Sequence, residues 1–207
     1  MTRSKSVRIG VIADTHGLFD QAIVRHFRGV DHILHAGDIG RLSVIEQLRV
    51  IAPVTAVSGN VDGYEQSGFP SETVIQLAGR RIGIRHVLYQ GGKLTKEGRA
   101  FLDREQPDIC LFGHTHQPRV EWFGPTLLVN PGSAGPKRFT LPRGLGVLSL
   151  RDGRFVPRLI SLQDGADSVS RTLGKTNFLW SGAAESVIRE KKRKALFTQI
   201  ETRRRVR

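Results

Sequence analysis

Residues 7–16 read VRIGVIADTH, a run of aliphatic residues that ends on polar side chains. The apolar character of Val7–Ala13 predicts a buried strand. Asp14 and His16 follow directly and lie two residues apart, so both side chains can turn toward the same side of the sheet edge. In an open α/β sheet, the crevice beyond the carboxyl ends of the strands is the usual ligand site. The stretch therefore predicts a strand that delivers functional side chains to such a crevice.

The same pattern of an aliphatic run followed by polar residues recurs before residue 117. The later motifs are Gly37-Asp38, Gly59-Asn60, His86 and Gly113-His114-Thr115-His116. Together with the first motif they supply two carboxylates, one amide and four imidazoles, which is a donor set suited to two neighbouring divalent metal ions. We therefore predict a dinuclear metal site formed by Asp14, His16, Asp38, Asn60, His86, His114 and His116.

Strands and helices alternate over the first 60 residues, which predicts parallel βαβ units. The expected strands are Val7–Ala13, His32–His35 and Val54–Val57, and the expected helices are Phe19–Arg28 and Val44–Val50. Later residues favour three hairpins: Glu72–Leu77 with Arg81–Arg85, Val120–Phe123 with Thr126–Val129, and Gly144–Leu150 with Arg154–Leu162. A helix over Leu94–Glu105 and a strand over Asp108–Phe112 lie between the first two. We expect an α/β fold, a four-layer α-β-β-α sandwich of two mixed sheets flanked by helices.

The composition is that of an ordinary globular protein, with 207 residues, 25% charged and 39% hydrophobic. No apolar stretch approaches the roughly 18 residues of a membrane span. The first residues lack the hydrophobic region of a signal peptide. The one cysteine, Cys110, lies in an apolar run and is expected to be a buried side chain. We therefore predict a cytoplasmic protein without a membrane span.

Positive charge is concentrated at the C-terminus: residues 166–207 carry 11 basic and 4 acidic residues, within a net charge of +13. We expect a linker over Gln163–Gly182 and a basic helix over Ala183–Thr202. The charge runs Arg189–Lys194 and Arg203–Arg205 have three interpretations: a solvated extension, attraction to nucleic acid, and membrane-surface association, which the small apolar face disfavours.

The order and spacing of the five motifs resemble the calcineurin-like metallophosphoesterase superfamily, and within it the small YfcE-like phosphodiesterases. The resemblance covers roughly residues 7–160 and includes the loop Asn130-Pro131-Gly132-Ser133. It implies a metallophosphoesterase domain over residues 1–163, followed by a basic C-terminal extension over 164–207 that is partly helical or disordered. It also implies one metal held by Asp14, His16 and His116, a second held by Asn60, His86 and His114, and Asp38 as the bridge between them. The candidate catalytic residues are Asn60, Asp62 and His114.

The implied reaction is hydrolysis of a small phosphodiester by a bridging hydroxide in a dinuclear site. Oxygen and imidazole ligands without thiolate suit Mn²⁺, our first expectation, and also Ni²⁺, Fe or Zn²⁺. Two alternatives stay open. One is a nuclease or nucleic-acid end-processing enzyme tethered by the basic tail, and the other is a non-catalytic protein-binding scaffold of the retromer-subunit type. Small relatives often self-associate, so a homodimer is a further expectation.

Departures from the family pattern define further hypotheses. Larger members follow the Gly-Asn pair with a histidine that can protonate the leaving group, but this chain continues with Val61-Asp62. Asp62 is therefore the candidate acid, or alternatively a loop carboxylate that orients a metal-ligating histidine. Small members often have His-Gly-His at His86, where this chain has Val87-Leu88 next. Lys137 and Arg138 are expected either to contact a phosphate or to form a solvated basic loop.

Overall fold

The computed structural model describes residues 6–63, 68–138, 140–151 and 154–162. The chain divides into two units, residues 1–177 and 178–207, and all described residues belong to the first. The predicted linker, basic helix and tail interactions lie outside the described residues. Three helices are described: α1 (Ala22–His26), α2 (Leu42–Ile51) and α4 (Lys96–Glu105). The strands are β1 (Val7–Ile12), β2 (His32–His35), β3 (Val54–Ala56), β4 (Glu72–Leu77), β5 (Arg80–Arg85), β6 (Tyr89–Gln90), β7 (Lys93–Leu94), β8 (Ile109–Leu111), β9 (Arg119–Phe123), β10 (Thr126–Asn130), β11 (Arg143–Arg151) and β12 (Arg154–Leu162).

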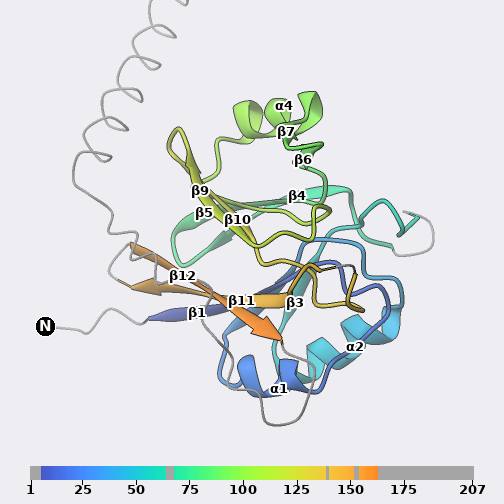
Figure 1. Ribbon diagram of the computed structural model, residues 1–207. Helices are drawn as coiled ribbons and strands as arrows, with labels where there is room; N and C mark the ends of the chain where they lie inside the picture. The colour runs from blue at the N-terminus through green and yellow to red at the C-terminus, as the bar shows by residue number, and fades with distance from the viewer. Residues whose placement is uncertain (1–5, 64–67, 139, 152–153, 163–207) are drawn as a thin grey trace, which may run out of the picture. The chain divides into compact units, whose positions relative to one another are not determined.

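The strands form two five-stranded mixed sheets and one small hairpin (Figure 1). The first sheet has the order β12-β11-β1-β2-β3, and the second has the order β4-β5-β8-β10-β9. Within the first sheet β1, β2 and β3 run parallel, and within the second β5, β8 and β10 run parallel. Each sheet therefore has a group of parallel strands whose carboxyl ends share one edge.

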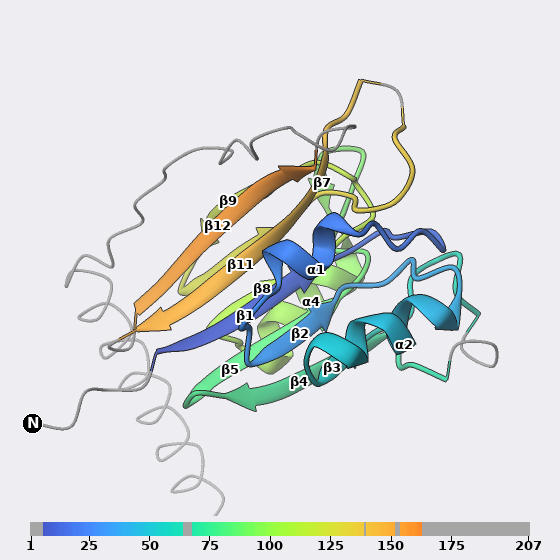
Figure 2. The ribbon, with the colours of Figure 1, turned by 90° about the horizontal axis from the view of Figure 1, so that it is seen from below.

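Three layers of apolar contacts hold the elements together. Between the two sheets, Ile9 and Leu34 belong to the same buried cluster as Ile82 and Leu111. Helices α1 and α2 cover the other face of the first sheet (Figure 2), where Ile23, Phe27 and Leu48 are buried among residues of β1 and β2. Helix α4 packs on the second sheet through Phe101 and Leu102, against Cys110 and Leu128. The predicted four-layer sandwich is confirmed. In the part of the chain that the structure describes, no helix is long and apolar enough to cross a membrane.

Several predicted boundaries were wrong for local reasons. The first helix is shorter than the predicted Phe19–Arg28, because the Asp20 carboxylate accepts the Ala22 N–H at 2.8 Å and Gly29 has φ +71°. The hairpin of β6 and β7 was not predicted. Strand β7 includes Leu94, so α4 begins only at Lys96. Thr95 is the N-cap of this helix, and its hydroxyl accepts the Gly98 N–H at 2.9 Å.

Candidate metal centre

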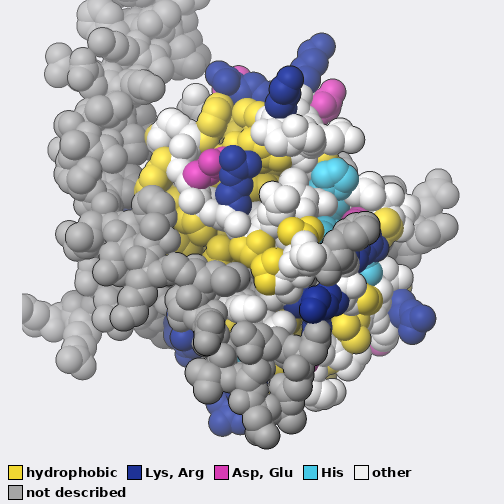
Figure 3. Space-filling model, in the orientation of Figure 1, with side chains coloured by type: hydrophobic (Ala, Val, Ile, Leu, Met, Phe, Trp, Pro, Cys, Tyr) yellow, Lys and Arg dark blue, Asp and Glu magenta, His cyan; other side chains and the backbone are white. Residues whose placement is uncertain are grey.

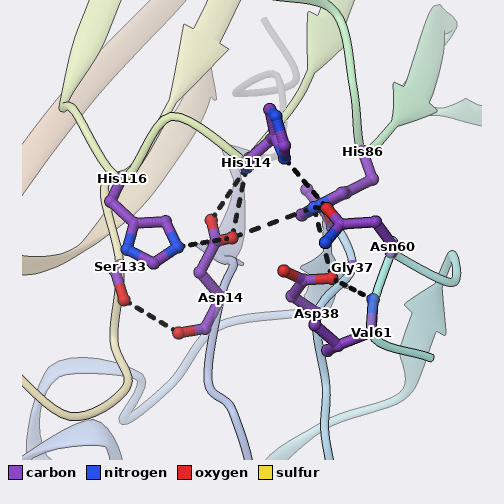
Figure 4. A network of polar contacts seen from close by, with 12 residues as sticks. Asp14, Gly37, Asp38, Asn60, Val61, His86, His114, His116 and Ser133 are labelled. Carbon is purple, nitrogen blue, oxygen red and sulfur yellow. Dashed lines mark hydrogen bonds and ion pairs between the residues drawn. The ribbon is translucent and has the colours of Figure 1, made fainter. Parts of the chain in front are cut away.

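All five polar motifs lie just beyond the carboxyl ends of parallel strands. Asp14 follows β1, Asp38 follows β2 and Asn60 follows β3, whereas His86 follows β5 and the Gly113–His116 loop follows β8. The first three strands belong to one sheet and the last two to the other. The motifs therefore meet at the edge shared by the two sheets, and Figure 4 shows their side chains pointing toward one another.

One side of the centre, here called the Asp14 side, consists of Asp14, His16 and His116. His116 Nε2 lies 3.2 Å from Asp14 Oδ1 and 3.3 Å from His16 Nε2. His16 Nε2 also lies 3.8 Å from Asp38 Oδ2. One donor atom from each of these four residues falls within 4.8 Å of all the others. Such a cluster of two carboxylates and two imidazoles can hold a divalent ion.

The opposite side, here called the Asn60 side, consists of Asn60, His86 and His114. Asn60 Oδ1 lies 3.1 Å from His86 Nε2 and 2.9 Å from His114 Nδ1. His86 Nε2 also lies 3.3 Å from Asp38 Oδ1. Asp38 thus has one carboxylate oxygen near a histidine of each side. The structure brings together all seven residues that the sequence indicated.

Hydrogen bonds from the surrounding backbone orient the donor groups. His86 Nδ1 lies 2.7 Å from the Ala36 carbonyl and donates to that oxygen, which directs Nε2 toward Asp38. The Val61 N–H donates to Asp38 Oδ1 at 3.0 Å. The His114 N–H donates to both oxygens of Asp14, at 3.1 and 3.2 Å. The Ser133 hydroxyl donates to the Asp14 carbonyl at 2.9 Å, a contact that the sequence did not reveal.

The backbone is strained at most of the donor residues. Five of the seven have a positive φ although none is glycine: Asp14 at 53°, His16 at 47°, Asp38 at 54°, His114 at 67° and His116 at 55°. The left-handed region costs a non-glycine residue about 1–3 kcal/mol, and such residues cluster at functional sites. The fold holds these side chains in unfavourable backbone conformations, and the cluster itself is a reason to place function here.

Glycines in the motifs leave room for donors from other strands. A Cβ added at Gly113 would lie 2.7 Å from Asp14 Oδ2 and 3.0 Å from His86 Nδ1. A Cβ added at Gly59 would overlap both the carboxylate and the backbone nitrogen of Asp38. Glycine therefore precedes Asn60 and His114 because the donors approach the backbone more closely than a methyl group allows.

The electrostatics of the site favour an ionised carboxylate at its centre. Burial, the largest single influence, would raise the pKa of Asp38, but the hydrogen bond and charge of His86, together with the Val61 N–H and the charge of His16, lower the pKa to about 2. For His86 burial alone would lower the pKa, but Asp38 and Asp14 raise it above its ordinary value. Burial lowers the pKa of His16 and of His114, which favours the neutral imidazole that binds metals.

Asp62 lies beside the centre and holds its loops. Its carboxylate oxygens accept backbone N–H groups from Ile39, Gly40 and Gly59 at 2.8, 2.8 and 2.9 Å. These bonds link the segment after β2 to the segment after β3. These are the contacts of a loop carboxylate, but they hold backbone N–H groups and not the ring of a metal-ligating histidine, which was the alternative to the proton donor.

His35 is a buried histidine behind the Asp14 side. The Gly37 N–H donates to His35 Nδ1 at 3.2 Å, so the ring proton resides on Nε2, which lies 3.0 Å from the Thr15 hydroxyl oxygen. Burial lowers the pKa of His35 to about 4, and the residue is neutral at physiological pH. It supports the loop that carries Asp14 and His16.

With this geometry in view, residues 7–153 match the family described as the calcineurin-like phosphoesterase superfamily domain. The chain belongs to the calcineurin-like phosphoesterase superfamily. A probable metallophosphoesterase from Methanothermobacter thermautotrophicus is 34% identical over 140 residues, which is 65% of this chain and 81% of the relative. The resemblance seen in the sequence is confirmed.

Two solved structures share the fold. Vps29 from Entamoeba histolytica, solved in complex with Zn²⁺, is 22% identical, covers 81% of this chain and 100% of its own, and has a TM-score of 0.65. An archaeal phosphodiesterase is 21% identical, covers 75% of this chain and 100% of its own, and has a TM-score of 0.60. At these identities the likeness concerns the fold alone. Function must therefore be argued from the site.

Proposed function

We propose that this metallophosphoesterase is a dinuclear enzyme that hydrolyses phosphodiesters. The observation that carries the proposal is the convergence of seven oxygen and nitrogen donors from five strand ends, with Asp38 facing both sides. Two divalent ions bound there would activate water and screen the charge that develops on phosphorus. Mn²⁺ is the first candidate, and Ni²⁺, Fe and Zn²⁺ suit the same donors.

The residues fit two metals that share one carboxylate. Asp14, His16 and His116 would hold the first ion, Asn60, His86 and His114 the second, and Asp38 would bridge them. The carbonyl of Ala36 fixes the His86 ring so that Nε2 faces the centre. The low pKa of Asp38 keeps its carboxylate charged at neutral pH, as a bridging ligand requires.

A diester is the proposed substrate because Asn60, at the rim of the Asn60 side, is open to solvent. Asn60 is exposed and His114 is half-buried, whereas Asp14, Asp38 and His86 are buried. An exposed donor at the rim leaves space for the two substituents that a diester carries on its phosphorus. Asn60 and His114 would then lie close enough to contact a phosphate oxygen.

Hydrolysis of bis(p-nitrophenyl) phosphate by metal-stripped protein tests the proposal, with Mn²⁺, Ni²⁺, Zn²⁺ or Mg²⁺ added back and p-nitrophenyl phosphate as the monoester control. We expect metal-dependent turnover that favours the diester. His116→Ala should abolish it, and His26→Ala on α1, remote from the centre, should not. Turnover of the monoester alone would refute the diester assignment.

A protein-binding scaffold is the second candidate, favoured by the fold shared with Vps29. The complete donor set argues for catalysis over this alternative. Absence of turnover with every metal, from folded protein, would establish the scaffold as the better account. The third hypothesis, a nuclease tethered by the basic tail, predicts oligonucleotide hydrolysis that falls when residues 183–207 are deleted.

A further inference from the structure

The loop that follows β10 is fixed against the Asp14 side of the centre. The Gly135 N–H donates to the Asp14 carbonyl at 2.9 Å, and the Ala134 N–H donates to the Ala13 carbonyl at 3.0 Å. Asn130 Nδ2 donates to the Gly113 carbonyl at 2.9 Å, which ties the start of the loop to the segment that carries His114 and His116. The loop is therefore anchored to donor segments from both sheets.

A buried arginine, paired with the half-buried Asp20, holds the same loop from behind. Arg143 is 8% exposed, and its Nε donates to the Gly135 carbonyl at 2.7 Å. Its Nη2 donates to Asp20 Oδ2 at 2.7 Å and to the Ala134 carbonyl at 3.2 Å. Through these bonds Arg143 fixes the backbone just before Pro136, whose ring further restricts the chain.

Lys137 and Arg138 come next and are exposed. The Leu141 N–H donates to the Arg138 carbonyl at 3.2 Å, so a turn fixes the arginine's backbone. Arg138 lies three residues beyond Gly135, whose N–H donates to the Asp14 carbonyl at 2.9 Å, so its side chain extends from a segment anchored at the Asp14 side of the centre. No carboxylate among the described residues forms an ion pair or hydrogen bond with Arg138.

A second arginine lies on the same side. A Cβ added at Gly17 would lie 3.0 Å from Arg41 Cγ and 3.3 Å from Arg41 Nε, so the Arg41 side chain covers the residue next to His16. Figure 3 shows Lys and Arg side chains beside histidines on this face. The Asn60 side differs, because Val61 next to Asn60 is an apolar side chain that is 50% exposed.

We infer that Arg138, assisted by Arg41 and Lys137, binds a second phosphate of the substrate on the Asp14 side of the centre. The inference rests on the proposed function and specifies its substrate class: phosphodiesters that carry a further phosphate, such as a phosphorylated nucleotide ester or an oligonucleotide. Arginine suits this task because its planar guanidinium forms paired hydrogen bonds with phosphate oxygens. The subsite would act independently of the basic tail.

Two matched substrates test the inference: thymidine 5′-(p-nitrophenyl phosphate) with and without a 3′-phosphate. We expect a kcat/KM about tenfold higher for the 3′-phosphorylated ester, the size of one charge-assisted hydrogen bond. Arg138→Gln should reduce this ratio to about two, and the ratio should also fall as NaCl screens the charges. Arg49→Gln, at an exposed arginine near the end of α2, is the control and should keep the full ratio.

Binding of product-like ligands separates the inference from the proposed function. Calorimetry with Mn²⁺-loaded protein should give tighter binding of thymidine 3′,5′-bisphosphate than of thymidine 5′-monophosphate, and Arg138→Gln should remove the difference. If neither ester is hydrolysed but this difference persists, the phosphodiesterase proposal fails and the phosphate subsite stands. If both esters are hydrolysed equally, or Arg138→Gln leaves the ratio unchanged, the subsite is refuted.

Discussion

The two sides of the metal centre differ in their backbone conformations. On the Asp14 side all three residues are left-handed, namely Asp14, His16 and His116, whereas on the Asn60 side only His114 is. Asn60 and His86 are placed instead by side-chain contacts: His86 binds the Ala36 carbonyl, and Asn60 contacts both histidines of its side. The residues of the Asp14 side thus have strained backbone conformations that tertiary hydrogen bonds impose, whereas Asn60 and His86 lack this strain. Asp38 shares features of both, because it has a positive φ and accepts the Val61 N–H.

The comparison implies that metal binding on both sides is impaired together only when Asp38, the residue that the two sides share, is changed. Asp38→Asn removes the negative charge that both metals would share, so we expect kcat/KM for bis(p-nitrophenyl) phosphate to fall about a hundredfold or more. Asp103→Asn, at an exposed carboxylate on α4, controls for the loss of one charge. Activity of Asp38→Asn within tenfold of the wild type would show that the sides work without a bridge.

Gly59→Ala tests whether close packing, rather than strain, positions the Asn60 side. Gly59 does not have a positive φ, so its new methyl group would act only by overlapping Asp38. We expect a loss of about 2–3 kcal/mol in the free energy of unfolding, together with reduced turnover. Gly124→Ala is the matched control: its methyl group meets open space and costs only the left-handed penalty at φ +57°, about 1 kcal/mol. Equal losses in the two variants would contradict the steric argument.

The free energy of unfolding should depend on pH through His35, the buried histidine behind the Asp14 side. The pKa of this histidine is about 4 in the folded chain and ordinarily 6.5, so the unfolded state binds the proton more readily. Stability is therefore full above pH 6.5 and falls as the pH drops toward 4, by up to about 3 kcal/mol. The raised pKa of His86 acts in a separate window, above pH 6.5.

Urea unfolding of metal-stripped protein at pH 6.5 and pH 4.5 measures the His35 effect. The wild type should lose stability between these values, and His35→Gln should lose markedly less. Burial also lowers the pKa values of His16, His26, His32 and His114, so part of the loss should remain in the variant. An undiminished pH dependence in His35→Gln would show that this histidine does not cause the loss of stability at low pH.

Asp62→Asn is expected to have the smallest effect, because the residue joins the segments after β2 and β3 and is not one of the metal donors. An amide retains one acceptor oxygen of the two that hold Ile39, Gly40 and Gly59, so the loops should loosen and activity should fall several-fold. The decrease should be the same for aryl and alkyl phosphodiesters. Selective slowing of the alkyl ester, whose leaving group needs a proton, would restore Asp62 as the general acid.

The sequence indicated which side chains the structure brings together, but not the contacts that position them. Motifs after β1, β2, β3, β5 and β8 could be recognised because each follows an aliphatic run, and parallel strands bring their carboxyl ends to one edge. The strain at Asp14 and His16 could not be foreseen, because it arises from tertiary contacts such as the bond from the Asp14 N–H to the Gly37 carbonyl. The same holds for Ser133 and Asp62, whose bonds join segments distant in sequence.

Local boundaries were predicted less well where short-range hydrogen bonds decide them. The bond from the Ala22 N–H to the Asp20 carboxylate precedes α1, and Thr95 caps α4, but a single residue of this kind is a weak signal within a helical pattern. The β6–β7 hairpin has two residues in each strand, too few for a recognisable alternation of apolar and polar side chains. The fold class did not depend on these details, because it follows from the longer strands.

Counting the metal ions bound to each variant tests the central claim most directly. Metal-stripped protein would be titrated with Mn²⁺, and the bound metal measured by calorimetry and elemental analysis. The account predicts two ions per chain in the wild type, one in His116→Ala and one in His86→Ala, with the spectroscopic signature of a coupled Mn²⁺ pair only in the wild type. A single ion in the wild type, or loss of the same ion in both variants, would contradict a centre built from two sides around Asp38.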